Sequence, residues 1–262
     1  MKLSRLFLIA APLLLLCGTA APVHAQFRSG MQAAPPPSVL HPAPSQWWIG
    51  PLAGANLNSH TGDFVTDFCD CGFEDGSGTG MSLGLEIGHY LSSTFAIALK
   101  AMYSDLRADY SYQIREDAEV LGEGLVEDVL FERRNTVVLG YFMIHPVLQL
   151  HPIRGLYVFA GPALGVSTTA TQEYTKVVTD ERFDFELGDS ETRIVSRDTG
   201  DLPRAESLRA DLRFGVGANL RLSRSILFAP EVSYAYPLTT ISDDDDWSAE
   251  AIHLIGVFKF EI

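Results

Sequence analysis

Beyond residue 25, the chain lacks any uninterrupted apolar run of the roughly 18 residues that a transmembrane helix needs. A helical membrane anchor in the body of the chain is therefore excluded. Only helices and closed barrels can satisfy all their backbone hydrogen bonds in lipid. Any membrane crossing by this part of the chain must consequently be made by strands.

Cysteine is also scarce, with three residues in the whole sequence. Leu16 stands before Cys17, where a lipid anchor would need a small residue, so we do not expect lipidation. Cys69 and Cys71 are one residue apart, and a disulfide between them would close a small, strained ring. A disulfide and an incidental exposed pair remain open alternatives. Apart from His60, the usual zinc ligands do not follow nearby.

Basic residues are too few to balance the acidic ones. The sequence has 19 Lys and Arg residues and 33 Asp and Glu residues, which gives a formal net charge of −14. This balance argues against nucleic acid as a partner and against simple adhesion to anionic lipid. A protein partner, which the sequence does not identify, would be cationic or bridged by a metal ion.

The N-terminus has the pattern of an exported protein. Lys2 and Arg5 precede an apolar stretch, and small residues follow as far as Ala25, which predicts a Sec-type signal peptide over 1–25. Residues 26–45 contain five prolines and few apolar residues, which is typical of an extended linker and predicts a periplasmic one. The folded part is predicted to cover residues 46–262.

Apolar residues recur with a period of two in the folded part, which predicts strands that have one face in an apolar medium. Eight such segments are present: 47–57, 81–87, 95–103, 137–143, 156–166, 208–222, 226–236 and 252–262. Each is long enough, or close to it, for a tilted strand that crosses a bilayer. We predict an all-β fold: an eight-stranded antiparallel up-and-down transmembrane β-barrel with long extracellular loops.

Charged residues provide a second pattern, because Arg or Lys facing lipid at mid-bilayer costs about 2–4 kcal/mol. Nearly all charged residues of the segments fall on the face opposite to the apolar one. Six of them predict an ion-paired cluster in the lumen: Glu86, Lys100, Arg209, Asp211, Arg213 and Glu231. A barrel of eight strands is only wide enough for side chains to fill it, which favours a plug. A narrow gated ion path is the alternative.

The connections between segments alternate between short and long, as in bacterial outer-membrane barrels. The long ones cover roughly 58–80, 105–134, 167–206 and 239–247, and they carry most of the acidic residues. Within the last of them, Asp243, Asp244, Asp245 and Asp246 offer hard oxygen ligands that suit Ca²⁺ or Mg²⁺. Four consecutive residues cannot all reach one ion, so we expect at most weak divalent-cation binding there.

Three stretches combine glycine, aromatic residues and alternating apolar residues: Leu156 to Gly165 (LYVFAGPALG), Glu231 to Thr239 (EVSYAYPLT) and the ending from Gly256 to Ile262 (GVFKFEI). Together they resemble the PorT-like family of outer-membrane β-barrel proteins, a group of small barrels. The opening from Gly50 to Leu57 (GPLAGANL) is similar to that family's first strand. The resemblance implies a barrel in the outer membrane. Some members are implicated in secretion, an activity that the resemblance does not transfer to this chain.

The sequence offers little chemistry for catalysis. His60 has Thr61 and Asp63 beside it, but no second segment completes a nucleophile–base–carboxylate set. We therefore expect a non-enzymatic integral outer-membrane protein without a cofactor, acting as an anchor or through loop-mediated surface contacts. The alternative is a small channel for ions or apolar solutes. The expected partners are outer-membrane lipid and divalent cations at the acidic loops.

Overall fold

The computed structural model describes residues 47–66, 68, 71–119, 126–180, 193–202, 204–242 and 246–262. All of them fall within one unit, His41–Ile262. The predicted signal peptide and linker lie outside the described residues, so their boundaries stay predictions. In the part of the chain that the structure describes, no helix has the length and apolar character needed to cross a membrane.

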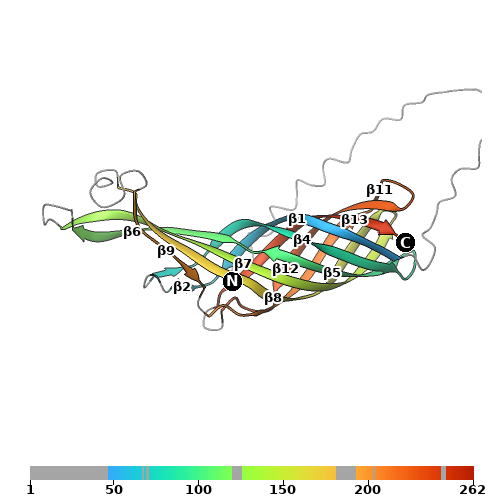
Figure 1. Cartoon of the computed structure of the whole chain (residues 1–262), viewed down its shortest axis with the longest axis horizontal. Coiled ribbons are helices and arrows are strands. Elements are labelled where there is room, and N and C mark those ends of the chain that lie inside the picture. The colour runs from blue at the N-terminus through green and yellow to red at the C-terminus, as the bar shows by residue number, and fades with distance from the viewer. Residues whose placement is uncertain are drawn as a thin grey trace, which may run out of the picture. The chain divides into compact units, whose positions relative to one another are not determined.

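Eight of the described strands close into an antiparallel ring (Figure 1), which confirms the predicted fold class. In ring order they are β1 (Trp47–Thr61), β4 (Gly76–Tyr90), β5 (Phe95–Asp105), β7 (Val126–Ile153), β8 (Leu156–Val178), β10 (Leu208–Ala218), β12 (Ile226–Pro237) and β13 (Ser248–Glu261). The first and last strands pair with each other, from Trp48 opposite Glu261 to Thr61 opposite Ser248, and this pairing closes the barrel. Closure leaves no free edge in the ring.

The short connections lie where the sequence predicts them. The chain turns between β4 and β5 at residues 91–94 and between β7 and β8 at Arg154 and Gly155. Gly155 has a φ of 81°, a backbone conformation that suits glycine. A two-residue strand, β11 (Leu220–Arg221), continues the line of β10 along β12 before the third short turn.

The two faces of the ring have opposite character. Outward-facing apolar side chains are exposed, with Leu85 at 57% and Leu164 at 62%, whereas the inward-facing Glu86 and Lys100 are 0% and 2% exposed. A soluble barrel would place its apolar residues inside. This apolar band around a polar interior is the arrangement of a barrel surrounded by hydrocarbon.

The long connections lie where the sequence predicts them, and two of them contain further long strands. β6 (Ala108–Glu119) pairs along the outer part of β7, and β9 (Ile194–Asp201) pairs along the outer part of β8. Together with residues 126–139 of β7 and 167–178 of β8 they form a four-stranded outer sheet that extends beyond the ring (Figure 1). β7 has 28 residues, about 90 Å at about 3.3 Å per residue, whereas a bilayer crossing needs roughly 9–11 residues.

A further small hairpin, β2 (Phe64–Thr66) and β3 (Cys71–Phe73), lies in the connection between β1 and β4. Phe64 and Phe73 are directly opposite in its register, and both are buried against the main core cluster. The hairpin therefore packs onto the outer end of the barrel interior.

Candidate functional site

The lumen contains a buried ion-paired cluster near the short-turn end of the barrel. Glu86 of β4 lies opposite Lys100 of β5 in the strand register, with Lys100 Nζ 3.3 Å from Glu86 Oε2. Lys100 also forms an ion pair with Glu231 of β12, and Lys259 of β13 lies 3.7 Å from Glu86 Oε1. We call these four residues the inner cluster. Its two carboxylates and two ammonium groups cancel in formal charge.

Aromatic side chains enclose the inner cluster. Trp48 Nε1 donates to Glu86 Oε1 at 2.7 Å, and the Tyr157 hydroxyl donates to Glu231 Oε1 at 2.7 Å. Lys259 Nζ lies 4.6 Å from the ring centroid of Tyr157 and 5.0 Å from that of Trp48. Buried charges need partners of this kind, because an unpaired ion in an apolar interior loses its hydration without compensation. The inner cluster therefore fills this level of the lumen with matched charge.

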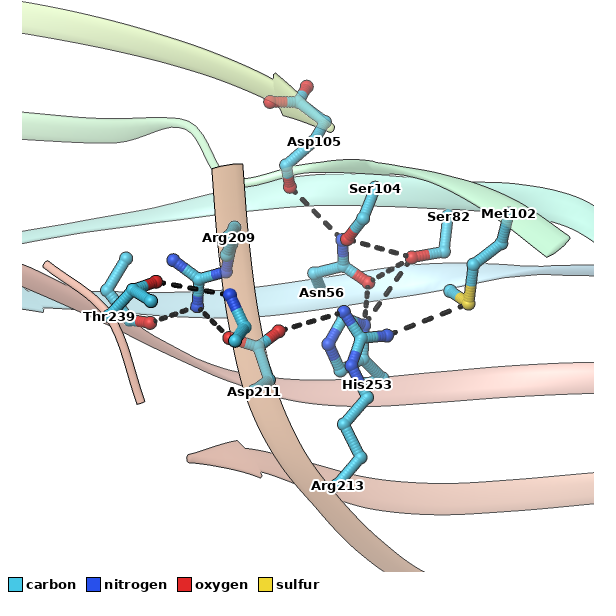
Figure 2. A network of polar contacts seen from close by, with 12 residues as sticks. Asn56, Ser82, Met102, Ser104, Asp105, Arg209, Asp211, Arg213, Thr239 and His253 are labelled. Atoms are coloured by element: carbon cyan, nitrogen blue, oxygen red, sulfur yellow. Dashed lines mark hydrogen bonds and ion pairs between the residues drawn. The ribbon is translucent and has the colours of Figure 1, made fainter. Parts of the chain in front are cut away.

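A second charged group, the middle cluster, lies on β10 (Figure 2). Arg209, Asp211 and Arg213 alternate along the strand, so their side chains share its inward face. Arg209 Nη2 lies 2.8 Å from Asp211 Oδ1, and Arg213 Nη2 lies 3.2 Å from Asp211 Oδ2. Arg209 also donates to the carbonyl of Ala249 at 2.5 Å, and Arg213 contacts the Met102 sulfur at 3.6 Å.

An amide of β1 organises the polar side chains beside the middle cluster (Figure 2). Asn56 Nδ2 donates to the carbonyls of Met81 at 3.2 Å and Asp105 at 3.1 Å, which fixes the orientation of the amide. Its Oδ1 then accepts from Ser82 Oγ at 2.8 Å and from His253 Nδ1 at 2.7 Å. The proton of neutral His253 is therefore on Nδ1, because an amide oxygen can only accept.

An aromatic cap closes the outer end of the lumen, beyond the apolar band. Trp247 Nε1 donates to the Tyr110 hydroxyl at 3.0 Å, which lies 2.6 Å from His60 Nδ1. His60 Nε2 donates to the carbonyl of Leu106 at 2.9 Å, so Nδ1 of the neutral ring accepts the proton of Tyr110. Phe64 stacks on Trp247 with ring centroids 4.4 Å apart.

Burial sets the protonation of His60. Removal from water lowers the pKa of His60 from 6.5 to about 3, although its hydrogen bond to the Leu106 carbonyl opposes this change. The imidazole is consequently neutral at ordinary pH. Its contacts are a phenol, a backbone carbonyl and an indole, so the catalytic set considered for His60 is not assembled among the described residues.

The outer sheet has ion pairs of a different kind. Glu116 of β6 contacts both Arg133 of β7 and Lys176 of β8, with Lys176 Nζ at 2.6 Å. Burial raises the pKa of Glu116, but the hydrogen bond and charge of Lys176, together with Arg133, outweigh this effect and lower the pKa. Further out, Arg115 and Asp128 form a 3.2 Å pair in which both side chains are 57% exposed.

Most residues of the remaining predicted sites lie outside the part of the chain that the structure describes. Asp243, Asp244 and Asp245 lie outside the described residues, and Asp246 is exposed. Cys69 and the side chain of Cys71 also lie outside it, so the disulfide alternatives stay open. Within the described ranges, no group of three or more His, Cys, Asp or Glu residues could hold a metal ion.

The sequence reasoning left important lumen residues out of the predicted cluster. The structure separates the six predicted residues into two groups: Glu86, Lys100 and Glu231 in the inner cluster, and Arg209, Asp211 and Arg213 in the middle cluster. Lys259 is the missing fourth member of the inner cluster. The sequence pattern that could have added Lys259 to the predicted cluster is its position on the inward face of the last strand.

No protein-family model matches the chain, and no curated protein matches it. The solved structures that the chain resembles include the following three. Ail, the attachment invasion locus protein of Yersinia pestis, in complex with the heparin analogue sucrose octasulfate, is 9% identical over 82% of this chain and 99% of its own, with a TM-score of 0.31. Neisserial surface protein A is 10% identical over 82% and 97%, with a TM-score of 0.35. The outer membrane protease OmpT of Escherichia coli is 9% identical over 84% and 97%, with a TM-score of 0.32. Likenesses of this size transfer no role to the chain.

Proposed function

We propose that the chain is a non-enzymatic integral protein of the outer membrane that stays closed and makes contacts outside the cell through its outer sheet. The observation that carries the proposal is the length of β7 and β8, whose outer parts continue as paired strands far beyond the apolar band. Membrane crossing alone does not require this length. The extra strands build a paired surface in the position where barrels of this kind present their loops.

The filled lumen supports the closed state. The inner cluster, the middle cluster and the aromatic cap occupy three successive levels, and Trp48, Tyr141, Tyr157 and Trp247 are almost fully buried there. In planar bilayers we expect no steady conductance. Steady single-channel openings would contradict the plug and favour the alternative, a small channel for ions or apolar solutes.

The charge of the outer region indicates the chemistry of its partner. The connections predicted as loops carry most of the 33 acidic residues, so the partner is expected to be cationic or bridged by divalent cations. Weak divalent binding at Asp243–Asp246 belongs to this hypothesis. The PorT-like resemblance stays a prediction and assigns no activity.

A shortened outer sheet tests this function. Tyr112 and Arg133 are opposite each other in the β6–β7 register, so residues 113–132 can be replaced by an Asn-Gly turn that keeps Tyr110 and the aromatic cap. A labelled oligolysine peptide should bind the mature barrel in lipid nanodiscs at low salt, and the shortened variant should bind it clearly less.

The matched control keeps the full length and removes charge. Asp117, Glu127 and Asp128 are exposed on the same hairpin, and their amide replacements should weaken oligolysine binding without shortening the sheet. If the peptide bound the shortened variant as well as the parent protein, the outer sheet would not be the contact surface. Heat-modifiable migration of each variant on gels verifies that the barrel is still folded.

A further inference from the structure

The seam between β7 and β8 contains a gap in its ladder inside the apolar band. Ile144 pairs with Leu164 and Leu148 pairs with Ala160, but the three residue pairs between them form no bridges. The same register places Pro146 opposite Pro162, and neither has an N–H to donate. Both prolines keep their pairings on the other side, Pro146 with Leu99 of β5 and Pro162 with Leu212 of β10. The weakness is therefore specific to this seam.

Backbone packing replaces the missing hydrogen bonds at the gap. A Cβ atom at Gly161 would lie only 1.9 Å from the carbonyl oxygen of Pro146, so the two strands approach as closely as glycine permits. On the lumen side, His145 is buried next to Pro146. On the outer face Ala160 contributes only a single methyl, so the side chains there rise little above the backbone of the seam.

The outer surface of the seam forms one end of an apolar groove. The groove has a volume of about 560 Å³, runs across the strands from Trp47 of β1 to Pro162 of β8, and has almost no polar surface. At about 4.8 Å per strand, the four steps from β1 to β8 span roughly 19 Å. One leaflet of a bilayer core is about 15 Å thick, so an acyl chain has the length to lie along the groove.

The two ends of the groove differ in depth. Trp47 begins β1 and His89 lies two residues before the β4–β5 turn, and their rings are 4.6 Å apart at the short-turn rim. Pro146 and Pro162 lie deeper in the apolar band. Tryptophan rings are favoured at the level of lipid head groups, and the apolar deep end suits the tail. This polarity selects a lipid of the leaflet on the short-turn side.

We propose that this groove is a fixed site for one acyl chain of a glycerophospholipid, with the tail seated over the β7–β8 seam. Apolar volumes of this size are typical of ligand sites, and no charged side chain lines this one. Lipids that contact the rest of the apolar band exchange freely with the surrounding bilayer. The inference depends on the membrane location in the proposed function but not on the closed lumen or on the outer sheet.

Lipid retention tests the site. Mature protein extracted from outer-membrane fractions and washed extensively in detergent should retain a single phospholipid, measured by phosphorus assay and by mass spectrometry of the extracted lipid. Spin-labelled phosphatidylethanolamine added to the reconstituted protein should then show an immobilised component. A wild-type protein without either signal would overturn the proposal.

Filling the groove should remove the lipid. Ala160→Phe places a ring in the groove, and Ala160→Leu is a milder form should the larger side chain prevent folding. We expect the relative association constant of the spin-labelled lipid to fall about tenfold, which corresponds to about 1.4 kcal/mol. Ala53→Phe is the matched control, because Ala53 is exposed in the same band on β1 but does not line the groove.

Equal losses in the Ala160 and Ala53 variants would mean that lipid is held by the whole band, and this result would overturn the proposal. Equal retention in wild type and both Ala160 variants would do the same. Heat-modifiable migration and the oligolysine assay report on the barrel and the outer sheet separately. A failed lipid site is therefore distinguishable from a failed proposed function.

Discussion

The lumen and the outer sheet contain the same kinds of ion pair in opposite surroundings. In the inner cluster, the side chains of Lys100 and Glu86 are 2% and 0% exposed, whereas both members of the Arg115–Asp128 pair are 57% exposed. Exposed pairs contribute little because water and salt screen them, whereas removing one partner of a buried pair leaves an uncompensated charge. Breaking a lumen pair is therefore expected to destabilise the barrel strongly, whereas the outer pairs mainly shape a solvated surface.

The largest effect is expected from breaking the inner cluster. Lys100→Met leaves the carboxylates of Glu86 and Glu231 with only Lys259 as a cation. We expect the free energy of unfolding to fall by about 3–5 kcal/mol, as for other buried pairs that lose one partner. Urea unfolding of the detergent-solubilised barrel, followed by heat-modifiable migration, measures it.

The control for this prediction restores neutrality. Adding Glu231→Gln to Lys100→Met removes the unmatched charge, so the double variant should recover part of the loss. If Lys100→Met alone stayed within about 1 kcal/mol of the parent protein, the inner cluster would be hydrated, and its contrast with the outer sheet would disappear.

The next largest effect is a pH dependence at the aromatic cap. The pKa of His60 in the folded chain is about 3, below its ordinary value of 6.5, so the folded state prefers the neutral ring. Its contribution is fully present above pH 6.5 and is lost as the pH falls from 6.5 towards 3. At pH 4.5 the loss should be about 2–3 kcal/mol.

His60→Gln provides the comparison for the cap. Glutamine does not titrate in this range, so the difference in unfolding free energy between pH 7 and pH 4.5 should be smaller in the variant by the amount due to His60. An identical pH profile for the two proteins would show that His60 is not desolvated as the structure places it.

The sequence predicts the eight-stranded ring and the residues that face its lumen. It does not predict the level along the barrel axis at which each of these residues lies. Alternation of apolar and charged residues is enough to assign Glu86 and Lys100 to the lumen, and the short β4–β5 turn makes them cross-strand partners. Whether Lys259 or Arg213 lies at their level depends on strand tilt and stagger around the closed ring, which alternation alone does not determine.

The outer sheet escaped prediction for another reason. Its inward positions alternate between apolar residues such as Phe131 and charged ones such as Glu116, Arg133 and Lys176, so the hydrophobic period disappears from the sequence. Ion pairs across the strands take the place of apolar contacts there. A period of two read without regard to charge would have indicated these strands.

A smaller effect is expected where the outer sheet is partly buried. Glu116→Gln removes two ion pairs whose side chains are 15–26% exposed, and should lower local stability by about 0.5–1 kcal/mol. Because the pKa of Glu116 is lowered, its contribution is present above the ordinary carboxyl range and is lost as the pH falls below about 4. Amide hydrogen exchange of β6 at pH 7 measures the difference, which Glu116→Asp should only partly reproduce.

The smallest effect is expected at the pair that differs most from the inner cluster. Arg115 and Asp128 are 3.2 Å apart, yet both are largely hydrated, so Arg115→Ala should change hydrogen exchange in β6 and β7 by less than about 0.5 kcal/mol. Asp128→Ala should have the same small effect, and the double variant should match the sum of the two. A coupling energy above about 1 kcal/mol in this double-mutant cycle would show that charges stabilise the outer sheet as they do the lumen. The two regions would then differ in the burial of their ion pairs but not in what those pairs contribute to stability.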